Sequence, residues 1–363
     1  MKKIIKISVY TGIAFAIFAI SCKNKPAKER MSIAPAFYLW KNTTGALSEN
    51  EITCIAKTKT EKLYVKFFEV EKDELLGAIP VAKTAFHYWG SKSIGGDSVQ
   101  RYILNNLEII PVVYINNNVL QGITEDSVAL LAENILFLID KYYQTQIKNS
   151  TTTYNELQID CDWTATTKNN YFNLLRRLDE KTEKIISCTL RLYPFKYRKN
   201  MGVPPVNKVM LMCYNLNNPL QYEDKNSILD VTELSKYVKN AKPYPLPIDV
   251  ALPVFSWAVL YHNNQFSGLL NIEGKTLSSI TRNVKPLWYA VTKDTLINDV
   301  YLRKGDELKL EEVSTDDLKH AIVILKNNIN FSKHTTVTLF SIDDKNNNHD
   351  TELFKTVFNN FNH

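Results

Sequence analysis

Short apolar runs recur along the chain from residue 35 onward, separated by polar or amphipathic stretches. They are rich in Val, Ile, Leu, Tyr and Phe, a composition that is typical of β-strands. Eight such runs cover residues 35–40, 62–70, 109–115, 156–162, 185–192, 208–215, 249–257 and 335–343. Several are followed by segments with the three-to-four-residue apolar period of an amphipathic helix. These helical segments cover residues 124–143, 169–182, 232–240, 315–328 and 351–361.

The alternation of strand and helix predicts the fold class. Eight strands with interleaved helices fit an α/β protein, a (β/α)8 or TIM barrel, over residues 32–363. Thr124 and Ser314 precede acidic residues at the start of two helical segments, which is typical of helix N-caps. A doubly wound open sheet is the alternative, but the glycine-rich first turn of that fold is absent.

Two parts of the chain depart from the regular alternation. Residues 262–314 hold strand-like pieces at 287–291 and 307–311, which predict a β-rich insertion on the rim between strands seven and eight. Residues 75–107 are irregular, with helix-like and loop-like parts. A separate C-terminal domain is an alternative, but the last strand and helix are needed to close a barrel.

The N-terminus has the pattern of a bacterial export signal. A basic start and an apolar run over 7–20 predict a signal peptide of residues 1–21, because the run is too short for a spanning helix. Ala19-Ile20-Ser21-Cys22 resembles a lipobox, with Ala19 in the place of the usual leucine. The resemblance implies lipidation of Cys22, a flexible tether over 22–31 and a membrane-anchored protein of the cell envelope. The alternative is an ordinary signal anchor with an incidental cysteine.

Charge and cysteine usage exclude several classes of protein. The 44 basic and 38 acidic residues give +6, and losing Lys2, Lys3 and Lys6 with the signal peptide would leave +3. This charge is too weak and dispersed to favour nucleic acid as a partner. No GxGxxG or GxxxxGK[ST] motif and no CxxC pair occurs, so we expect no nucleotide cofactor and no metal site. We expect a monomer. Four cysteines are expected to be buried thiols rather than disulfides: Cys54, Cys161, Cys188 and Cys213.

The fourth apolar run carries the strongest chemical signal. Side chains alternate along a strand, so Gln158, Asp160 and Asp162 share one face. Barrel sites lie at the carboxyl ends of strands, where two close carboxylates raise the pKa of one of them and suit acid/base chemistry. The alternative is a structural pair that begins the next loop. A divalent cation between these residues and Asp343 or Asp344 is a less favoured possibility.

Residues 156–163 resemble the fourth-strand DxDxE motif of chitinase-like glycoside hydrolases of the family 18 type. Residues 212–215, Met-Cys-Tyr-Asn, are similar to the M-x-Y-D motif of that family. The chain also resembles a group of bacterial secreted TIM-barrel proteins, on short motifs at residues 37–40, 110–114, 193–194 and 251–253. Two positions depart from the chitinase pattern: Thr164 stands where the family has its acidic glutamate, and Asn215 stands where it has aspartate.

The resemblance implies a glycan ligand and a set of site residues. Asp162, Asp160 and Tyr214 are the expected catalytic residues of a glycoside hydrolase, with Asp162 closest to the strand end. The missing acid implies that Asp162 or a carboxylate elsewhere, such as Glu69, Asp343 or Asp344, has taken its role. The alternative is a catalytically silent glycan-binding or scaffold lipoprotein of the envelope. The periplasmic face is favoured over the cell surface, because no acidic run follows Cys22 directly.

Aromatic residues near the predicted strand ends support a sugar ligand, since aromatic rings stack on the apolar faces of sugars. Core packing is the alternative for each ring. Arg191, near the end of the fifth run, could pair with an aspartate of the fourth as part of the site, and a purely structural ion pair between neighbouring strands is the equal alternative. The candidate substrate-binding residues are Trp40, Tyr38, Trp163, Tyr193, Asn215 and Trp257.

Overall fold

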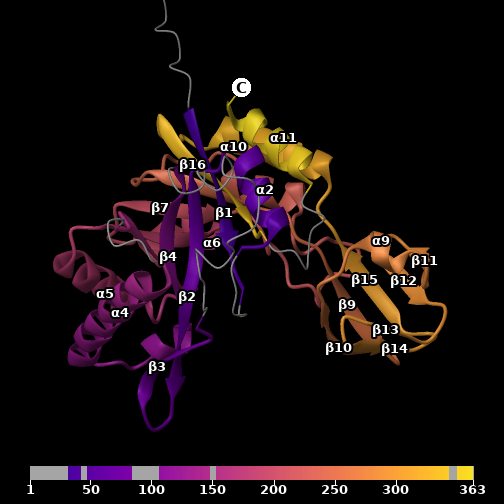
Figure 1. Cartoon of the computed structure of the whole chain (residues 1–363), viewed down its shortest axis with the longest axis horizontal. Coiled ribbons are helices and arrows are strands. Elements are labelled where there is room, and N and C mark those ends of the chain that lie inside the picture. The colour runs from indigo at the N-terminus through magenta and orange to yellow at the C-terminus, as the bar shows by residue number, and fades with distance from the viewer. Residues whose placement is uncertain (1–31, 42–46, 84–105, 148–152, 343–349, 363) are drawn as a thin grey trace, which may run out of the picture.

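A computed structural model describes residues 32–41, 47–83, 106–147, 153–342 and 350–362. Eight parallel strands form a closed barrel in the order β1-β16-β8-β7-β6-β5-β4-β2, and β1 pairs with β2 to complete the ring (Figure 1). The predicted TIM-barrel fold is therefore confirmed. The barrel strands are β1 (Ser32–Leu39), β2 (Lys62–Asp73), β4 (Glu108–Ile115), β5 (Glu156–Asp160), β6 (Ile185–Arg191), β7 (Lys208–Met212), β8 (Ile248–Pro253) and β16 (His334–Phe340).

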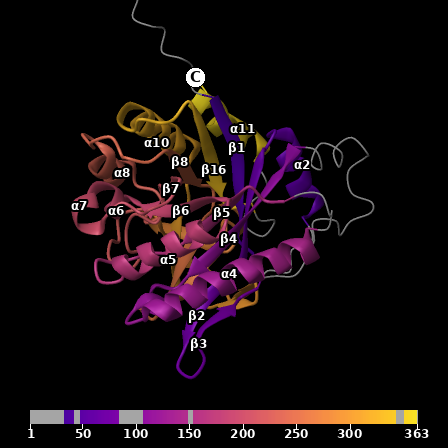
Figure 2. The same ribbon diagram turned by 90° about the vertical axis from the view of Figure 1, so that its left-hand side faces the viewer.

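Helices follow the barrel strands and lie outside the ring, with α4 and α5 side by side on one flank (Figure 2). The predicted caps form: the side chain of Thr124 accepts the amide hydrogen of Ser127, and that of Ser314 accepts the amide hydrogen of Asp317. The helices are α2 (Glu49–Lys57), η1 (Asn117–Leu120), α4 (Glu125–Gln146), α5 (Lys168–Lys181), α6 (Leu192–Lys196), α7 (Arg198–Met201), α8 (Val231–Val238), α10 (Thr315–Asn328) and α11 (Thr351–Asn362).

A second, antiparallel sheet lies beside the barrel, between β8 and α10 (Figure 1). This confirms the β-rich insertion between strands seven and eight. The seventh run is not a single strand, because β8 ends at Pro253 and the chain then leaves the barrel to begin β9. The insertion contains β9 (Trp257–His262), β10 (Gln265–Leu270), α9 (Gly274–Leu277), β11 (Thr281–Lys285), β12 (Trp288–Val291), β13 (Thr295–Ile297), β14 (Val300–Leu302) and β15 (Glu307–Glu311).

A buried carboxylate fastens this insertion to the barrel. Glu311 is fully buried, pairs with Lys309 at 2.6 Å and accepts a hydrogen bond from Trp257 Nε1 at 2.7 Å. It also accepts one from the hydroxyl of Ser227, which lies in the loop between β7 and α8. A buried charge is tolerated when it is paired and hydrogen-bonded in this way. The insertion is therefore held against the loop that leaves β7.

Part of the irregular stretch 75–107 forms β3 (Gly77–Val81), which the sequence pattern does not predict. It pairs antiparallel with the far end of β2 and lies at the open edge of the hairpin. Pro80 fits there because an edge strand does not need every amide as a donor. The remainder of the stretch, residues 84–105, lies outside the described residues.

The barrel interior is polar at its amino-terminal end. Lys208 pairs with Glu156 at 2.7 Å and with Asp249 at 2.8 Å, and the two carboxylates are almost fully buried. Burial lowers the pKa of Lys208, but the two carboxylates raise it by more, so the ammonium stays charged. This cluster lies at the end of the barrel opposite to the strand carboxyl ends.

No helix among the described residues is long and apolar enough to cross a membrane. The signal peptide, Cys22 and the tether all fall outside the described residues. The four other cysteines are buried free thiols.

Candidate functional site

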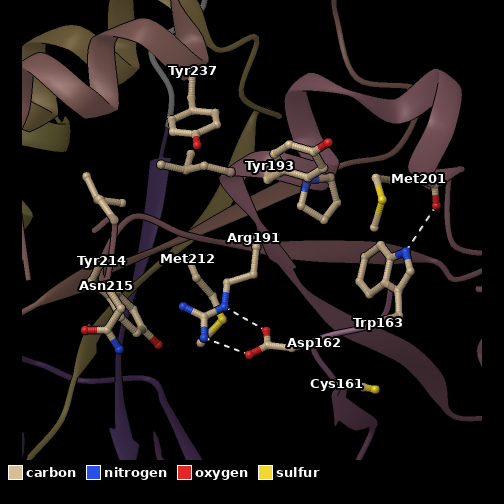
Figure 3. A pocket seen from close by; sticks show the side chains of 13 residues that line it. Cys161, Asp162, Trp163, Arg191, Tyr193, Met201, Met212, Tyr214, Asn215 and Tyr237 are labelled. Atoms are coloured by element: carbon tan, nitrogen blue, oxygen red, sulfur yellow. Dashed lines mark hydrogen bonds and ion pairs between the residues drawn. The ribbon is translucent and has the colours of Figure 1, made fainter. Parts of the chain in front are cut away.

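A cavity of about 340 Å³ opens at the carboxyl ends of β5, β6 and β7, where the fold places the sites of barrel proteins. Five of the predicted site residues line it, and Figure 3 shows them around its centre. They are Asp162, Trp163, Tyr193, Tyr214 and Asn215. The other lining residues are Cys161, Arg191, Leu192, Pro194, Met201, Met212, Leu216 and Tyr237.

Asp162 and Arg191 form a two-pronged ion pair in this cavity. Arg191 donates from Nε to Oδ1 of Asp162 at 2.7 Å and from its second terminal nitrogen to Oδ2 at 2.8 Å (Figure 3). These hydrogen bonds hold the pKa of the guanidinium above its ordinary value. The Asp162 side chain remains 46% exposed and that of Arg191 33%, so both charged groups are within reach of a ligand.

Asp160 lies one pleat deeper and is only 7% exposed. The Thr189 hydroxyl donates a hydrogen bond to its Oδ1 at 2.6 Å. Burial, with a smaller contribution from the negative charge of Asp162, raises the pKa of Asp160 to about 6. With this pKa, Asp160 would be present in both neutral and charged forms near pH 6.

Tyr214 and Asn215 leave the end of β7 in different directions. Tyr214 is buried against Phe340, with the ring centroids 5.0 Å apart, and burial raises its pKa well above the ordinary value. Its hydroxyl has no hydrogen-bond partner in the described part of the chain. Asn215 adopts a positive φ of 53°, a conformation that asparagine tolerates better than most residues, and its side chain is exposed.

Apart from Tyr214, two predicted aromatic residues line the cavity, Trp163 and Tyr193, and they differ in exposure. Trp163 is 4% exposed, stacks on Tyr171 and donates from Nε1 to the carbonyl oxygen of Met201 at 3.1 Å. Its ring therefore acts mainly as a wall of the cavity. Tyr193 is 50% exposed and belongs to the first turn of α6, not to a strand end as its pattern suggested.

The other three predicted aromatic residues do not line the cavity. Tyr38 is buried in the barrel and donates from its hydroxyl to Oε1 of Gln158 at 2.5 Å. Trp40 packs against Phe340, and Trp257 begins β9, where it binds Glu311. The structure thus separates a group of lining residues from rings that pack the barrel and fasten the insertion.

Thr164, at the position of the chitinase acid, lies in the loop after β5. Its hydroxyl contacts that of Thr166 at 2.8 Å and that of Thr167 at 3.2 Å, and its amide donates to the Thr167 hydroxyl at 3.0 Å. A threonine hydroxyl does not ionise in the range in which a general acid works. The position therefore stabilises the loop and supplies no proton donor.

Glu69, one of the alternatives for the missing acid, lies at the barrel mouth beside Tyr114 of β4. A bulge in β2 lets Phe67 and Phe68 both pack outward on α4, and the strand then turns Glu69 back to pair with the buried Lys66. Its negative charge contributes to the raised pKa of Asp160. Asp343 and Asp344, the other two alternatives, lie outside the described residues.

Tyr237 is a cavity residue that the sequence pattern does not identify. It comes from the short helix α8, and only the packing of α8 against α6 brings it to the mouth. Its one sequence signal is an aromatic residue on an amphipathic helix, which equally fits core packing. Within the described ranges, no group of three or more His, Cys, Asp or Glu residues could hold a metal ion.

Comparisons with solved structures give the class of the fold. The chain is similar to the spore cortex-lytic enzyme SleL of Bacillus megaterium QM B1551, with a TM-score of 0.54, 12% identity and coverage of 91% of this chain and 75% of that chain. For SleL of Bacillus cereus the TM-score is 0.51, with 13% identity and coverage of 90% and 74%. For the C-terminal domain of a presumed chitinase from Desulfitobacterium hafniense DCB-2 it is 0.50, with 8% identity and coverage of 92% and 99%.

The chain therefore has a TIM-barrel fold similar to those of SleL and the chitinase domain, and the predicted distant resemblance to chitinase-like barrels is confirmed at the level of the fold. No protein-family model and no curated protein sequence matches the chain.

Proposed function

We propose that the protein binds a glycan in the cavity at the carboxyl ends of β5, β6 and β7 and does not cleave it by chitinase-type chemistry. The observation that carries the proposal is the ion pair between Asp162 and Arg191, which is accessible in the cavity and engages both carboxylate oxygens. A carboxylate held in this way can still accept hydrogen bonds from sugar hydroxyls through its remaining lone pairs, while its two oxygens are already engaged by the arginine.

The proton donor of the chitinase pattern is missing from its usual position. Thr164 replaces it, and the threonine hydroxyl is engaged by the neighbouring threonines. Asp160 titrates in a useful range, but it is buried and hydrogen-bonded to Thr189 below the cavity floor. Both observations favour recognition of a glycan over hydrolysis.

The remaining groups suit a sugar. Tyr193 presents a half-exposed ring, the kind of surface on which the apolar face of a sugar stacks. The buried Tyr214 hydroxyl lacks a partner in the described part of the chain, and an unpaired buried hydroxyl costs about 1–3 kcal/mol. A ligand hydroxyl or amide would relieve that cost. The cavity volume falls at the lower end of the usual ligand range of about 300–1,000 Å³.

A glycoside hydrolase is the second candidate function. It is favoured by Glu69, which the β2 bulge brings to the barrel mouth, and by the raised pKa of Asp160. In this alternative one of the two supplies the proton and Asp162 assists. The carboxylate of Glu69 is engaged by Lys66, and this pair would have to break before Glu69 could reach a substrate, which favours the first proposal.

We further propose that the mature protein is anchored in the cell envelope through a lipid on Cys22, with its barrel on the periplasmic face. Support comes from the signal-like N-terminus, the lipobox-like residues 19–22 and the polar stretch that follows. A bound glycan would then be part of the envelope or pass through it.

A binding screen combined with product analysis tests the proposed function. The purified chain, begun at residue 23, is titrated with envelope and plant oligosaccharides, and each mixture is then examined by mass spectrometry. We expect at least one oligosaccharide to bind and to be recovered intact. Shortened products that disappear in Glu69→Gln or Asp160→Asn would establish the hydrolase instead, and absence of any ligand would refute both functions.

A further inference from the structure

A partly exposed group of tyrosines continues from the cavity onto α6 and α8. We call Tyr193, Tyr197, Tyr237 and Lys196 the tyrosine–lysine shelf. Tyr193 is 50% exposed and Tyr197 is 41% exposed, so both rings present aromatic surface to the solvent. Tyr193 and Tyr237 also line the cavity, so the shelf and the cavity form one continuous surface (Figure 3).

The shelf is organised by contacts among its own members. The ring centroids of Tyr193 and Tyr197 lie 4.6 Å apart. The Lys196 ammonium lies 5.4 Å from the ring centroid of Tyr197 and 5.5 Å from that of Tyr237. It also donates to the carbonyl oxygen of Lys236 at 2.8 Å, which fixes its position between the two rings. The charge is thus held over an aromatic surface at the edge of the cavity.

Lys196 carries the positive charge of the shelf. No carboxylate of the described residues forms an ion pair with Lys196, whose protein partner is a carbonyl oxygen. Residues 192–202 contain three basic side chains and no acidic one. Residues 230–243, which contain α8 and its N-cap, add three lysines against two acids, Asp230 and Glu233, and Glu233 pairs with Lys236. This flank of the cavity therefore attracts anions.

We propose that the tyrosine–lysine shelf is a second subsite and that the ligand of this protein is an acidic oligosaccharide. The inference rests on the proposed function. One sugar unit occupies the cavity at Asp162 and Arg191, and a following unit stacks on the tyrosines with its carboxylate or sulfate against Lys196. A neutral glycan would leave the ammonium without a counter-charge, and a monosaccharide would leave the exposed rings uncovered.

The test compares acidic with neutral ligands of equal length. Calorimetric titrations use a tetragalacturonate, a sulfated heparin tetrasaccharide, neutral chitotetraose and galacturonic acid alone. We expect an acidic tetrasaccharide to bind at least tenfold more tightly than the neutral tetrasaccharide or the acidic monosaccharide. Its affinity should fall as salt rises from 50 to 500 mM, because added ions screen partly exposed charges.

Two variants with matched controls locate the effect. Lys196→Gln should weaken binding of the acidic tetrasaccharide about 3- to 30-fold, and Tyr197→Ala should weaken it about 2- to 10-fold. Lys304→Gln and Tyr301→Ala remove the same groups from exposed positions on the insertion that do not line the cavity. These controls should bind like the wild type, and thermal melts should show that all four variants are folded.

Different results would refute the second subsite and the proposed function. One outcome is that chitotetraose binds, that Asp162→Asn abolishes this binding and that Lys196→Gln leaves it unchanged. This result would overturn the inference and keep the proposed function. An acidic tetrasaccharide whose affinity is the same in Lys196→Gln, Tyr197→Ala and the wild type would also overturn it. If none of the four saccharides binds, the inference falls, and the wider oligosaccharide screen decides the proposed function.

Discussion

Asp160 and Asp162 are separated by one residue and yet have different electrostatic environments. Asp162 is about half exposed and is held by Arg191, whereas Asp160 is buried and accepts a hydrogen bond from Thr189. Burial penalises the charged form of a carboxyl group, and an arginine partner favours it. The period of a strand puts the two aspartates on one face, and their depth then separates their properties.

This difference predicts a pH-dependent stability. Asp160 has a pKa of about 6 in the folded protein and the ordinary value of 3.8 when unfolded, so the folded state retains the proton between these values. The unfolding free energy therefore falls as pH rises from about 4 to 6 and stays reduced above that. Asparagine does not ionise, so Asp160→Asn should not show this fall in unfolding free energy. Its amide oxygen can still accept the hydrogen bond from the Thr189 hydroxyl. Relative to the wild type, the variant should gain about 1–3 kcal/mol between pH 4 and pH 7.

Urea denaturation of both proteins at pH 4, 5.5 and 7 measures the change. Comparing the difference between the two proteins cancels the contributions of their other titrating groups. A difference that does not vary with pH would show that Asp160 has an ordinary pKa in the folded state.

Sequence patterns predict some of these residues and not others. Asp160, Asp162 and the partner Arg191 follow from the alternation along neighbouring parallel strands, which is a local property. Tyr237 reaches the cavity, and Lys196 reaches the ring of Tyr237, through the packing of α8 on α6, which no local pattern reports. Tyr38 has the same aromatic character as Tyr193, but its position inside the barrel makes it a core residue.

At the scale of elements, the bulge in β2 decides which carboxylate reaches the barrel mouth. Regular alternation from Tyr64 and Lys66 would turn Phe68 inward and Glu69 outward. The extra residue lets Phe67 and Phe68 pack on Tyr143 and Tyr142 of α4, and Glu69 then faces Lys66. A bulge of this kind depends on packing against α4 and is invisible in the apolar pattern of the run.

We predict that Lys66 and Glu69 are energetically coupled. Lys66 is almost fully buried, and Lys66→Met should destabilise the fold by about 2–4 kcal/mol, because the carboxylate of Glu69 loses its main counter-charge. The double variant Lys66→Met/Glu69→Gln should recover about 1–2 kcal/mol of this loss. Denaturant unfolding of the four proteins of the cycle measures the coupling. Strictly additive changes in unfolding free energy would mean that Lys66 and Glu69 have no interaction energy with each other.

The elements that the sequence pattern misplaces share a physical cause. The run at 249–257 is apolar without a break from Val250 to Phe255, so the exit of the chain after Pro253 leaves no trace in its hydrophobicity. Tyr193 and Pro194 extend the apolar run of β6, although Leu192 already begins α6. The middle of a strand can be predicted from its composition. The ends of a strand depend on where the chain leaves the barrel for the next helix or insertion.

At the scale of the whole molecule, the two ends of the barrel have separate tasks. The amino-terminal end contains the buried cluster of Lys208, Glu156 and Asp249, and the carboxyl end contains the cavity. Lys208→Met should lower the unfolding free energy by about 2–5 kcal/mol, since two buried carboxylates lose their shared cation. Ligand affinity at 15 °C should change less than twofold. Chemical denaturation and titration of the same sample measure both, and a large loss of affinity in the folded variant would contradict the separation.

Lipid anchoring through Cys22 would decide whether the whole molecule is found in the membrane or the soluble fraction. Cys22→Ser removes the thiol that would carry the lipid, so the barrel should move from the membrane fraction to the soluble fraction. Fractionation with mass spectrometry of the N-terminal peptide measures the location and any acyl group. Ala19→Leu restores the usual lipobox residue and serves as a control that should remain in the membrane. Tight membrane association of a processed Cys22→Ser protein would exclude anchoring through this residue.

The most direct test of the central claim is a titration of wild type and Asp162→Asn with an oligosaccharide that the wild type binds. The substitution nearly preserves volume and removes the charge that Arg191 holds. We predict a loss of affinity of about 10- to 100-fold with a melting temperature within a few degrees of the wild type. Asp316→Asn, an exposed pair member on α10, should change neither. Unchanged affinity in Asp162→Asn would show that the glycan does not bind at this cavity, and an unfolded variant would show that the aspartate is structural.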